Sequence, residues 1–283
     1  MVSHGRRDLL SDSPNASHVR LFPMRLVALA FASFLAAAPV AQAGETAPRG
    51  VIELFTSQGC SACPPADRLA SELARDGQNL VLTLPVDYWD YLGWRDTLAS
   101  PANSARQRAY AATRGDRKIY TPQIVVNGRE AAVGGDGAAV AGVVTRAEAG
   151  DNALTLPVAV TAADGRVSVA VAQARTGGEP RHAEVWAFSV ERSRTVQIGR
   201  GENAGRTVTY ANVVRKMTRL GVWNGDAAKF DVPADELSHP DSDAVAIVVQ
   251  AGSGGQPGPI LGAAQVDQPK IAPTLQSRLR DPL

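Results

Sequence analysis

Apolar residues follow two different rhythms along this chain, and the rhythm changes near residue 151. Before that point, short apolar runs typical of buried strands alternate with segments of helical spacing. The run Val51–Thr56 is the clearest strand, and Leu69 and Leu73 follow it at the spacing of one helix face. The expected strands span residues 51–56, 80–86, 119–126 and 130–133, and the expected helices span residues 64–75, 100–114 and 136–149.

From Asn152 onward, short alternating runs are separated by Gly, Pro and Asp turns, a pattern typical of an all-β sandwich or barrel. Strands are expected at residues 154–161, 166–173, 181–190, 194–198, 207–212, 244–250 and 259–266, and a helix only at 213–220. The predicted fold class is therefore α/β: a βαβαββα domain at 45–150, then a sandwich-like domain at 152–267. We expect the polar tail, 268–283, to be loose.

Residues 1–43 do not have the pattern of a folded domain. Met24-Arg25 precedes a short apolar run, 26–38, and Ala41-Gln42-Ala43 has the small-residue pattern of a cleavage site. These features predict a secretory signal peptide at 24–43, with Met24 as an alternative start, and a periplasmic or secreted protein. The alternative hypothesis is a buried core helix. No cysteine lies at the cleavage site, so no stable membrane anchor is expected after cleavage.

Composition narrows the class of function. The formal net charge is +1, and no basic run with interleaved aromatics is present, which argues against a nucleic-acid partner. Four His and two Cys are too few for most zinc or haem frameworks. The Gly-rich stretch at 252–258 lacks the Lys-Ser/Thr of a phosphate-binding loop. We therefore expect no organic cofactor and no resident metal.

The two cysteines carry the clearest chemical signal. Cys60 and Cys63 stand where a strand ends and a helix begins, just before Pro64-Pro65, and Pro is favoured in the first turn of a helix. The N-terminus of a helix stabilises an anion, so we expect Cys60 to be the reactive thiolate and Cys63 the resolving thiol. This arrangement suits thiol–disulfide exchange with protein thiols or disulfides.

Two alternatives to redox chemistry stay open for the cysteine pair. One is a static disulfide in a binding module, although so small a loop gives little entropic stabilisation. The other is a copper(I) carrier, because two thiolates suit a soft ion. With no His nearby, the pair makes at most half of a zinc site.

Other polar and aromatic residues near this motif are candidates for function. Glu53 lies in an apolar strand, where it either faces solvent or is a partly buried carboxylate that passes protons to Cys63. Tyr88, Trp89 and Trp94 follow the second strand. If the two strands are parallel, these aromatics lie beside the cysteines, where they form either core or a partner-binding surface.

Several stretches resemble the thioredoxin superfamily, and more closely a family of secreted bacterial proteins of unknown function with a thioredoxin-like N-terminal domain. They are ELFTSQGCSACPPAD at 53–67, VDYWDYLGW at 86–94, YTPQIVVNG at 120–128 and GENAGRTVTYANVV at 201–214. The resemblance implies a cis-proline at Pro122 that faces the cysteines. It also implies that Thr121 offers backbone groups to a bound peptide.

The chain departs from thioredoxin in two places that tune redox potential. No Trp precedes Cys60, and Ser-Ala stands between the cysteines. Thioredoxins carry a buried Asp in the first strand of the motif, but Glu53 is offset from that position by one residue. The polar cluster Gly201-Glu202-Asn203 with Arg206 suggests no mechanism beyond a turn. The function expected from the sequence is a secreted thiol–disulfide oxidoreductase that acts on a protein partner.

Overall fold

The fold is taken from a computed structural model, which describes residues 47–149, 153–175 and 180–268. The expected signal peptide, the expected boundary at residue 151 and the expected tail beyond Gln268 lie outside these ranges. Among the described residues, no helix has the length and apolarity needed to cross a membrane.

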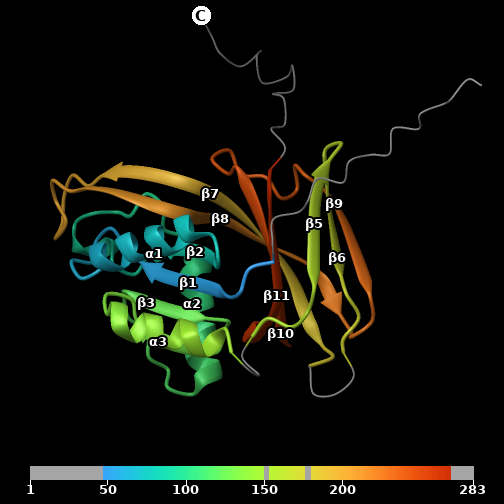
Figure 1. Ribbon diagram of the computed structural model, residues 1–283. Helices are drawn as coiled ribbons and strands as arrows, with labels where there is room; N and C mark the ends of the chain where they lie inside the picture. The colour runs from blue at the N-terminus through green and yellow to red at the C-terminus, as the bar shows by residue number, and fades with distance from the viewer. Residues whose placement is uncertain (1–46, 150–152, 176–179, 269–283) are drawn as a thin grey trace, which may run out of the picture. The chain divides into compact units, whose positions relative to one another are not determined.

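The first part of the chain has the predicted order of elements (Figure 1). Its strands are β1 (Val51–Thr56), β2 (Leu80–Pro85), β3 (Gln123–Val126) and β4 (Glu130–Val133), and its helices are α1 (Pro64–Asp76), the 3-10 turn η1 (Asp90–Leu92), α2 (Pro101–Arg114) and α3 (Gly137–Ala147). Helix α1 ends at Gly77, which has a left-handed φ of 70°, as the sequence predicts. The Asn127-Gly128 turn joins β3 and β4 into the expected hairpin.

The described part of the chain after residue 152 is built from strands, as predicted, and it also has a strand at 228–233 that was not expected. Its strands are β5 (Val158–Ala163), β6 (Arg166–Val171), β7 (Ala183–Gln197), β8 (Thr207–Trp223), β9 (Ala228–Pro233), β10 (Ala244–Ser253) and β11 (Gln256–Asp267). The two strands expected at 181–190 and 194–198 are one continuous strand, β7, because β8 pairs with it along this whole length.

The helix expected at 213–220 is wrong, because these residues lie inside β8. The pairing of β8 with β7 skips Arg215 and Leu220, so the strand carries two irregularities of the β-bulge kind. Each extra residue resets the alternation of faces. Val214, Met217 and Leu220 therefore recur at the spacing of a helix although the backbone is extended.

One large sheet joins both parts of the chain. Its strand order is β11-β10-β7-β8-β2-β1-β3-β4, and β5-β6-β9 form a second sheet of three strands. The link is between β2 and β8, where Thr83 pairs with Val213 and its hydroxyl donates to the carbonyl of Ala211 at 2.6 Å. The predicted domains at 45–150 and 152–267 thus both contribute strands to the large sheet, and the division into two domains stays a prediction.

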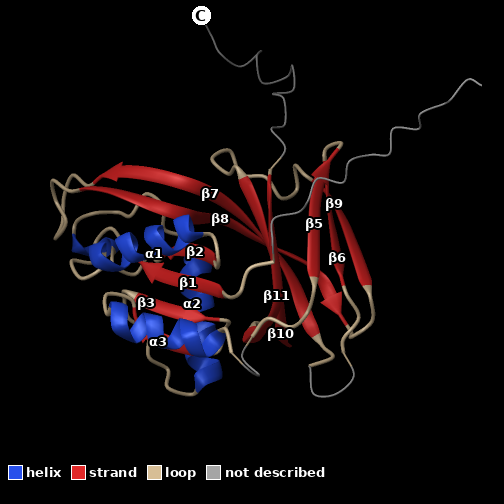
Figure 2. Ribbon diagram, viewed as in Figure 1, coloured by secondary structure: helices blue, strands red, loops and turns tan. Residues whose placement is uncertain are grey.

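Side chains of β1 face two different layers. Ile52 and Leu54 pack with Ala66 of α1 and Val140 of α3 on one face of the sheet. On the other face, Val51 and Phe55 pack with Tyr110 of α2. Figure 2 shows the helices gathered around β1, β2 and β3, away from β5, β6 and β9. A third cluster, with Val169 of β6 and Ile247 of β10, fills the space between the two sheets in a sandwich-like arrangement. Strand β1 is therefore covered on both faces, and its C-terminal end leads directly into the cysteine loop.

Candidate functional site

Cys60 and Cys63 form a disulfide at the N-terminal end of α1. Cys63 is the residue that caps the helix, so the pair stands at the end of the helix dipole that favours an anion. Only 2% of the surface of Cys60 is exposed and none of Cys63, whereas Ser61 and Ala62 between them are exposed. The two residues between the cysteines are therefore open to solvent, whereas both cysteines are covered.

The structure brings the Thr121-Pro122 pair next to the disulfide. The Thr121–Pro122 peptide bond is cis, and the carbonyl oxygen of Thr121 lies 3.7 Å from Sγ of Cys60. The hydroxyl of Thr121 is buried and has no hydrogen-bond partner among the described residues, while the carbonyl of Pro122 accepts from the amide of Gly134 at 2.9 Å. The placement expected from the sequence is confirmed, and the peptide-binding role stays a prediction.

The aromatic segment lies against the cysteine loop, but its members differ in what they contact. The indole N–H of Trp94 donates to Oε1 of Gln58 at 2.8 Å, and Trp89 packs on Gly59. The hydroxyl of Tyr88 instead donates to Gln107 of α2 at 3.0 Å. All three are half-buried, so they are neither simple core nor a fully open surface.

A buried carboxyl group that sequence reasoning missed lies one helical turn after Cys63. Asp67 is 2% exposed and accepts a 2.7 Å hydrogen bond from the hydroxyl of Thr56. Burial raises the pKa of Asp67 from 3.8 to about 7, with nearby Asp96 adding to the rise, while the Thr56 hydroxyl opposes it. The signal was available, because a carboxylate four residues after a cysteine in a helix shares its face.

A second buried carboxyl group, that of Asp96, is hydrogen-bonded to the cysteine loop. Asp96 accepts hydrogen bonds from the amides of Gln58, Leu98 and Ala99 at 2.8, 2.8 and 3.1 Å. Burial raises the pKa of Asp96 to about 6, and the backbone donors oppose this rise. Burial, together with Asp67 and Asp96, also raises the pKa of Tyr210 on β8. Burial thus raises the pKa of two carboxyls close in sequence or by hydrogen bonding to the cysteine loop, Asp67 after Cys63 and Asp96 at the amide of Gln58.

Glu53 has a different place from both readings of the sequence. It is fully buried, so the solvent-facing position is wrong. Its carboxylate pairs with Arg106 of α2 at 2.6 Å and accepts from the hydroxyl of Tyr110. Because side chains alternate along a strand, Glu53 points to the α2 face of the sheet, whereas Thr56 points to α1. Asp67, and not Glu53, is the buried carboxyl on the face of the cysteines.

Residues 51–250 match a family described as "Protein of unknown function (DUF1223)", over well more than half of the chain. The chain belongs to this family. The crystal structure of protein AGR_C_4864 from Agrobacterium tumefaciens is similar to this DUF1223 protein, with 30% identity and a TM-score of 0.70, over 80% of this chain and 97% of that one. HBP35 of Porphyromonas gingivalis shares the fold alone, with 15% identity and a TM-score of 0.53, over 82% of this chain and 79% of that one. A search of curated proteins finds no significant match.

The turn between β7 and β8 reaches the cysteine loop of the DUF1223 protein, although more than 140 residues separate them in sequence. We call residues 198–206 the hairpin tip. The side-chain amide of Asn203 donates to the carbonyls of Gln58 and Cys60, and the carboxylate of Glu202 accepts from the amide of Ser61. The polar cluster that suggested only a turn therefore belongs to this site.

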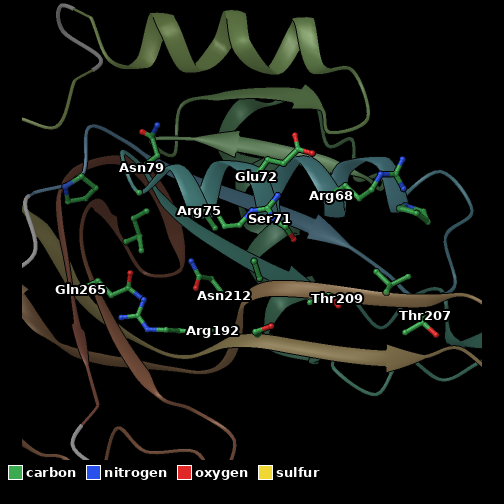
Figure 3. Close-up of a pocket in the computed structure, with 18 residues that line it drawn as sticks. Arg68, Ser71, Glu72, Arg75, Asn79, Arg192, Thr207, Thr209, Asn212 and Gln265 are labelled. Atoms are coloured by element: carbon green, nitrogen blue, oxygen red, sulfur yellow. The ribbon is translucent and has the colours of Figure 1, made fainter.

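A polar groove of about 790 Å³ runs between α1 and the arms of β7 and β8 (Figure 3). Ser71 and Arg75 of α1 face Asn212 of β8, with Arg192 and Gln265 at one end and Arg68 at the other. Pro64, the residue after Cys63, also lines it. Arg192 pairs with Asp267. The groove is rich in arginine and polar side chains, which suits a polar or anionic chain segment more than an apolar one.

No group of three or more His, Cys, Asp or Glu side chains is placed to hold an ion in the described ranges. In the described structure the two sulfur atoms are bonded to each other, so the chemistry present at this site is that of a disulfide.

Proposed function

We propose that this DUF1223 protein carries out thiol–disulfide exchange with a protein partner outside the cytoplasm. The observation that carries the proposal is the Cys60–Cys63 disulfide at the start of α1, with the carbonyl oxygen of Thr121 3.7 Å from Sγ of Cys60. The resemblance of this arrangement, and of the βαβαββα order before residue 150, to the thioredoxin superfamily supports it. The expected signal peptide supports an oxidising compartment.

The exchange is balanced without a cofactor when the partner carries two thiols. A partner thiolate attacks Sγ of Cys60, the Cys60–Cys63 bond breaks, and Cys63 leaves as a thiolate. The partner's second thiolate then attacks the partner sulfur of the mixed disulfide, and Cys60 leaves. Two electrons and two protons pass from the partner dithiol to the cysteine pair, and a partner disulfide drives the same steps in reverse.

Asp67 is our candidate for the group that exchanges a proton with Cys63. It lies one turn further along α1, is buried, and has a pKa of about 7, so both of its protonation states are populated near neutral pH. The protonated carboxyl gives its proton to the leaving thiolate of Cys63. In the reverse direction, the carboxylate takes the proton from the Cys63 thiol as it attacks.

The cis Thr121–Pro122 segment is our candidate for the dock of the partner chain. The backbone of Thr121 lies beside Cys60. Two large apolar side chains nearby are exposed: Ile119, two residues before Thr121, and Val133, at the end of β4. An extended partner segment that pairs with the Thr121 backbone would carry its own sulfur to Cys60. Trp89, which follows the C-terminal end of β2, packs on Gly59 and also borders the cysteine loop.

One observation favours a second candidate, a binding module with a static disulfide. Cys60 is only 2% exposed and Cys63 is fully buried, which shields both sulfurs from a partner. Under this second candidate the disulfide is a fixed brace for the loop. The two candidates differ in how readily the disulfide is reduced.

The deciding experiment combines a redox titration with trapping. Under the proposed function, glutathione buffers reduce the pair reversibly, with a potential well above the roughly −300 mV of structural disulfides. Cys63→Ser captures a partner as a mixed disulfide in the native compartment. The matched control Cys60→Ser does not, because Cys63 is buried. A pair that resists reduction, together with no adduct, favours the static disulfide.

A further inference from the structure

The hairpin tip holds the cysteine loop by its backbone. Asn203 is 1% exposed, and its side-chain amide donates at 2.9 Å to the carbonyl of Gln58 and at 2.8 Å to that of Cys60. The amide group of Asn203 thus donates both of its hydrogen bonds to a loop that is more than 140 residues away in sequence. Buried carbonyls that lose such a donor carry a desolvation penalty. Asn203 is therefore the anchor of the loop that carries Cys60.

The tip itself is fixed in place by Trp94. A Cβ atom at Gly199 or Gly201 would lie 3.1 or 3.2 Å from Trp94, so the glycines let the tip backbone rest directly on this side chain. The indole N–H of Trp94 donates to the side-chain oxygen of Gln58, and the main-chain carbonyl of Gln58 accepts from Asn203. One aromatic residue thus contacts both the tip and the cysteine loop.

Glu202 adds a negative charge beside the reactive cysteine. Its carboxylate lies 3.3 Å from the amide nitrogen of Ser61, the residue that directly follows Cys60. Amide groups at the start of a helix otherwise stabilise a thiolate. The carboxyls of Asp67 on α1 and Asp96 after β2 also lie behind this loop. A thiolate on Cys60 would therefore be repelled by the carboxylate of Glu202, and this repulsion opposes reduction of the disulfide.

We infer that the hairpin tip is a working part of the redox site, in which Asn203 is a positioning residue for the Cys60 loop and Glu202 makes the reduced pair less stable. The inference rests on the proposed function. Asn203 and Glu202 contact the loop in its oxidised form, and the carboxylate of Glu202 disfavours the thiolate that reduction would create on Cys60, so on this inference the tip stabilises the disulfide over the dithiol.

The test measures the equilibrium of the intact protein with glutathione, in which two glutathione molecules reduce the disulfide and one oxidised glutathione forms. For Glu202→Gln, the equilibrium constant for reduction should rise about three- to tenfold, where tenfold equals about 30 mV. Asn203→Ala should raise it by at least about threefold, and Asn203→Ser, which keeps one donor, should fall between it and the wild type. Glu236→Gln is the charge-matched control, since it removes an exposed carboxylate from the turn after β9.

The outcomes separate the two proposals. A wild-type pair that cannot be reduced reversibly overturns the proposed function and the inference with it. A reversible wild-type pair whose constant stays within about twofold in Glu202→Gln, as in the control, overturns only the inference, as does a shift toward harder reduction. Glu202 is exposed, so this variant folds even if Asn203→Ala does not.

A reciprocal measurement needs no substitution. If the tip stabilises the disulfide, reduction must weaken the docking of the tip by the same factor. The amide of Gly205, which donates to the carbonyl of Ile198 at 2.8 Å, should then exchange its hydrogen about three- to tenfold faster in the reduced protein. Equal exchange in both redox states would overturn the inference.

Discussion

The hydroxyl of Thr56, at the end of β1, donates a 2.7 Å hydrogen bond to the carboxyl of Asp67 on α1. The bond joins the strand that leads into the cysteine loop to the helix that follows it. Because Asp67 is otherwise buried, this hydroxyl opposes the rise in its pKa but does not cancel it. The pair thus holds a proton on the cysteine face of the sheet near neutral pH.

The first prediction concerns the pH dependence of stability. The folded protein keeps a proton on Asp67 up to a pH of about 7, whereas the unfolded chain loses it near the ordinary pKa of 3.8. Between these values the unfolded state binds fewer protons, so this group lowers the free energy of unfolding as the pH rises. Asp67→Asn removes the effect, and its oxygen still accepts from Thr56.

Denaturant unfolding at several pH values checks this prediction. The stability of Asp67→Asn relative to the wild type should increase by on the order of 2–4 kcal/mol between pH 4 and pH 8, since one pKa unit is worth about 1.4 kcal/mol. The matched variant is Asp76→Asn, which removes an exposed carboxylate from the other end of α1. A difference that does not change with pH would show that Asp67 ionises normally.

The second prediction assigns the buried Glu53–Arg106 pair to stability. Arg106 also donates to Tyr110 and to Gln250 of β10, so the pair ties β1, α2 and β10 together. Arg106→Leu leaves a buried, uncompensated carboxylate and should lower the free energy of unfolding by about 3–5 kcal/mol. Glu53→Leu combined with Arg106→Leu should cost less than Arg106→Leu alone.

A further substitution, Glu53→Gln, tests the proton-transfer role that the sequence suggests for Glu53. Because Glu53 faces α2 and the cysteines face α1, Glu53→Gln should leave the glutathione equilibrium of the cysteine pair unchanged while stability falls. Asp67→Asn should instead slow the attack by Cys63. A tenfold change in this equilibrium constant in Glu53→Gln would instead support a proton-transfer role for Glu53.

The third prediction concerns Trp94, which the sequence assigned to partner binding. Its indole N–H donates to Gln58, and its ring contacts Gly199 while its Cβ contacts Gly201, both in the hairpin tip. Trp94→Phe should therefore lower the free energy of unfolding by about 1 kcal/mol through the lost hydrogen bond. Tyr88→Phe, which loses a hydrogen bond to α2 instead, is the control that should leave exchange at the tip unchanged.

The sequence was most informative where the structure is local. A strand, a turn, two cysteines and a Pro-Pro pair are sufficient to place Cys60 and Cys63 at a helix start, because each step depends on neighbouring residues. The Asn127-Gly128 hairpin follows for the same reason. The place of Pro122 beside Cys60 came from a resemblance and not from its own neighbours.

Features set by distant contacts could not be read in this way. Because side chains alternate along β1, Glu53 and Thr56 point to opposite faces of the sheet. Only the position of α1 shows which of these faces is the one next to the cysteines. The contact of Asn203 with Cys60 spans 143 residues and rests on a hairpin whose length depends on bulges in β8. Periodicity reports which residues share a face, and not what covers that face.

The last prediction concerns Gly128, where the β3–β4 turn meets the β10–β11 hairpin. Gly128 has a φ of +66°, and a Cβ atom there would lie 2.5 Å from the carbonyl oxygen of Gly258. Gly165, in the β5–β6 turn, has a φ of +71° with nothing within 4 Å. Gly165→Ala thus measures backbone strain alone, about 1 kcal/mol. Gly128→Ala adds a clash with backbone and should cost about 1–3 kcal/mol more in denaturant unfolding. Equal losses in the two variants would mean that the two hairpins are not held against each other, because a free Gly258 could move away.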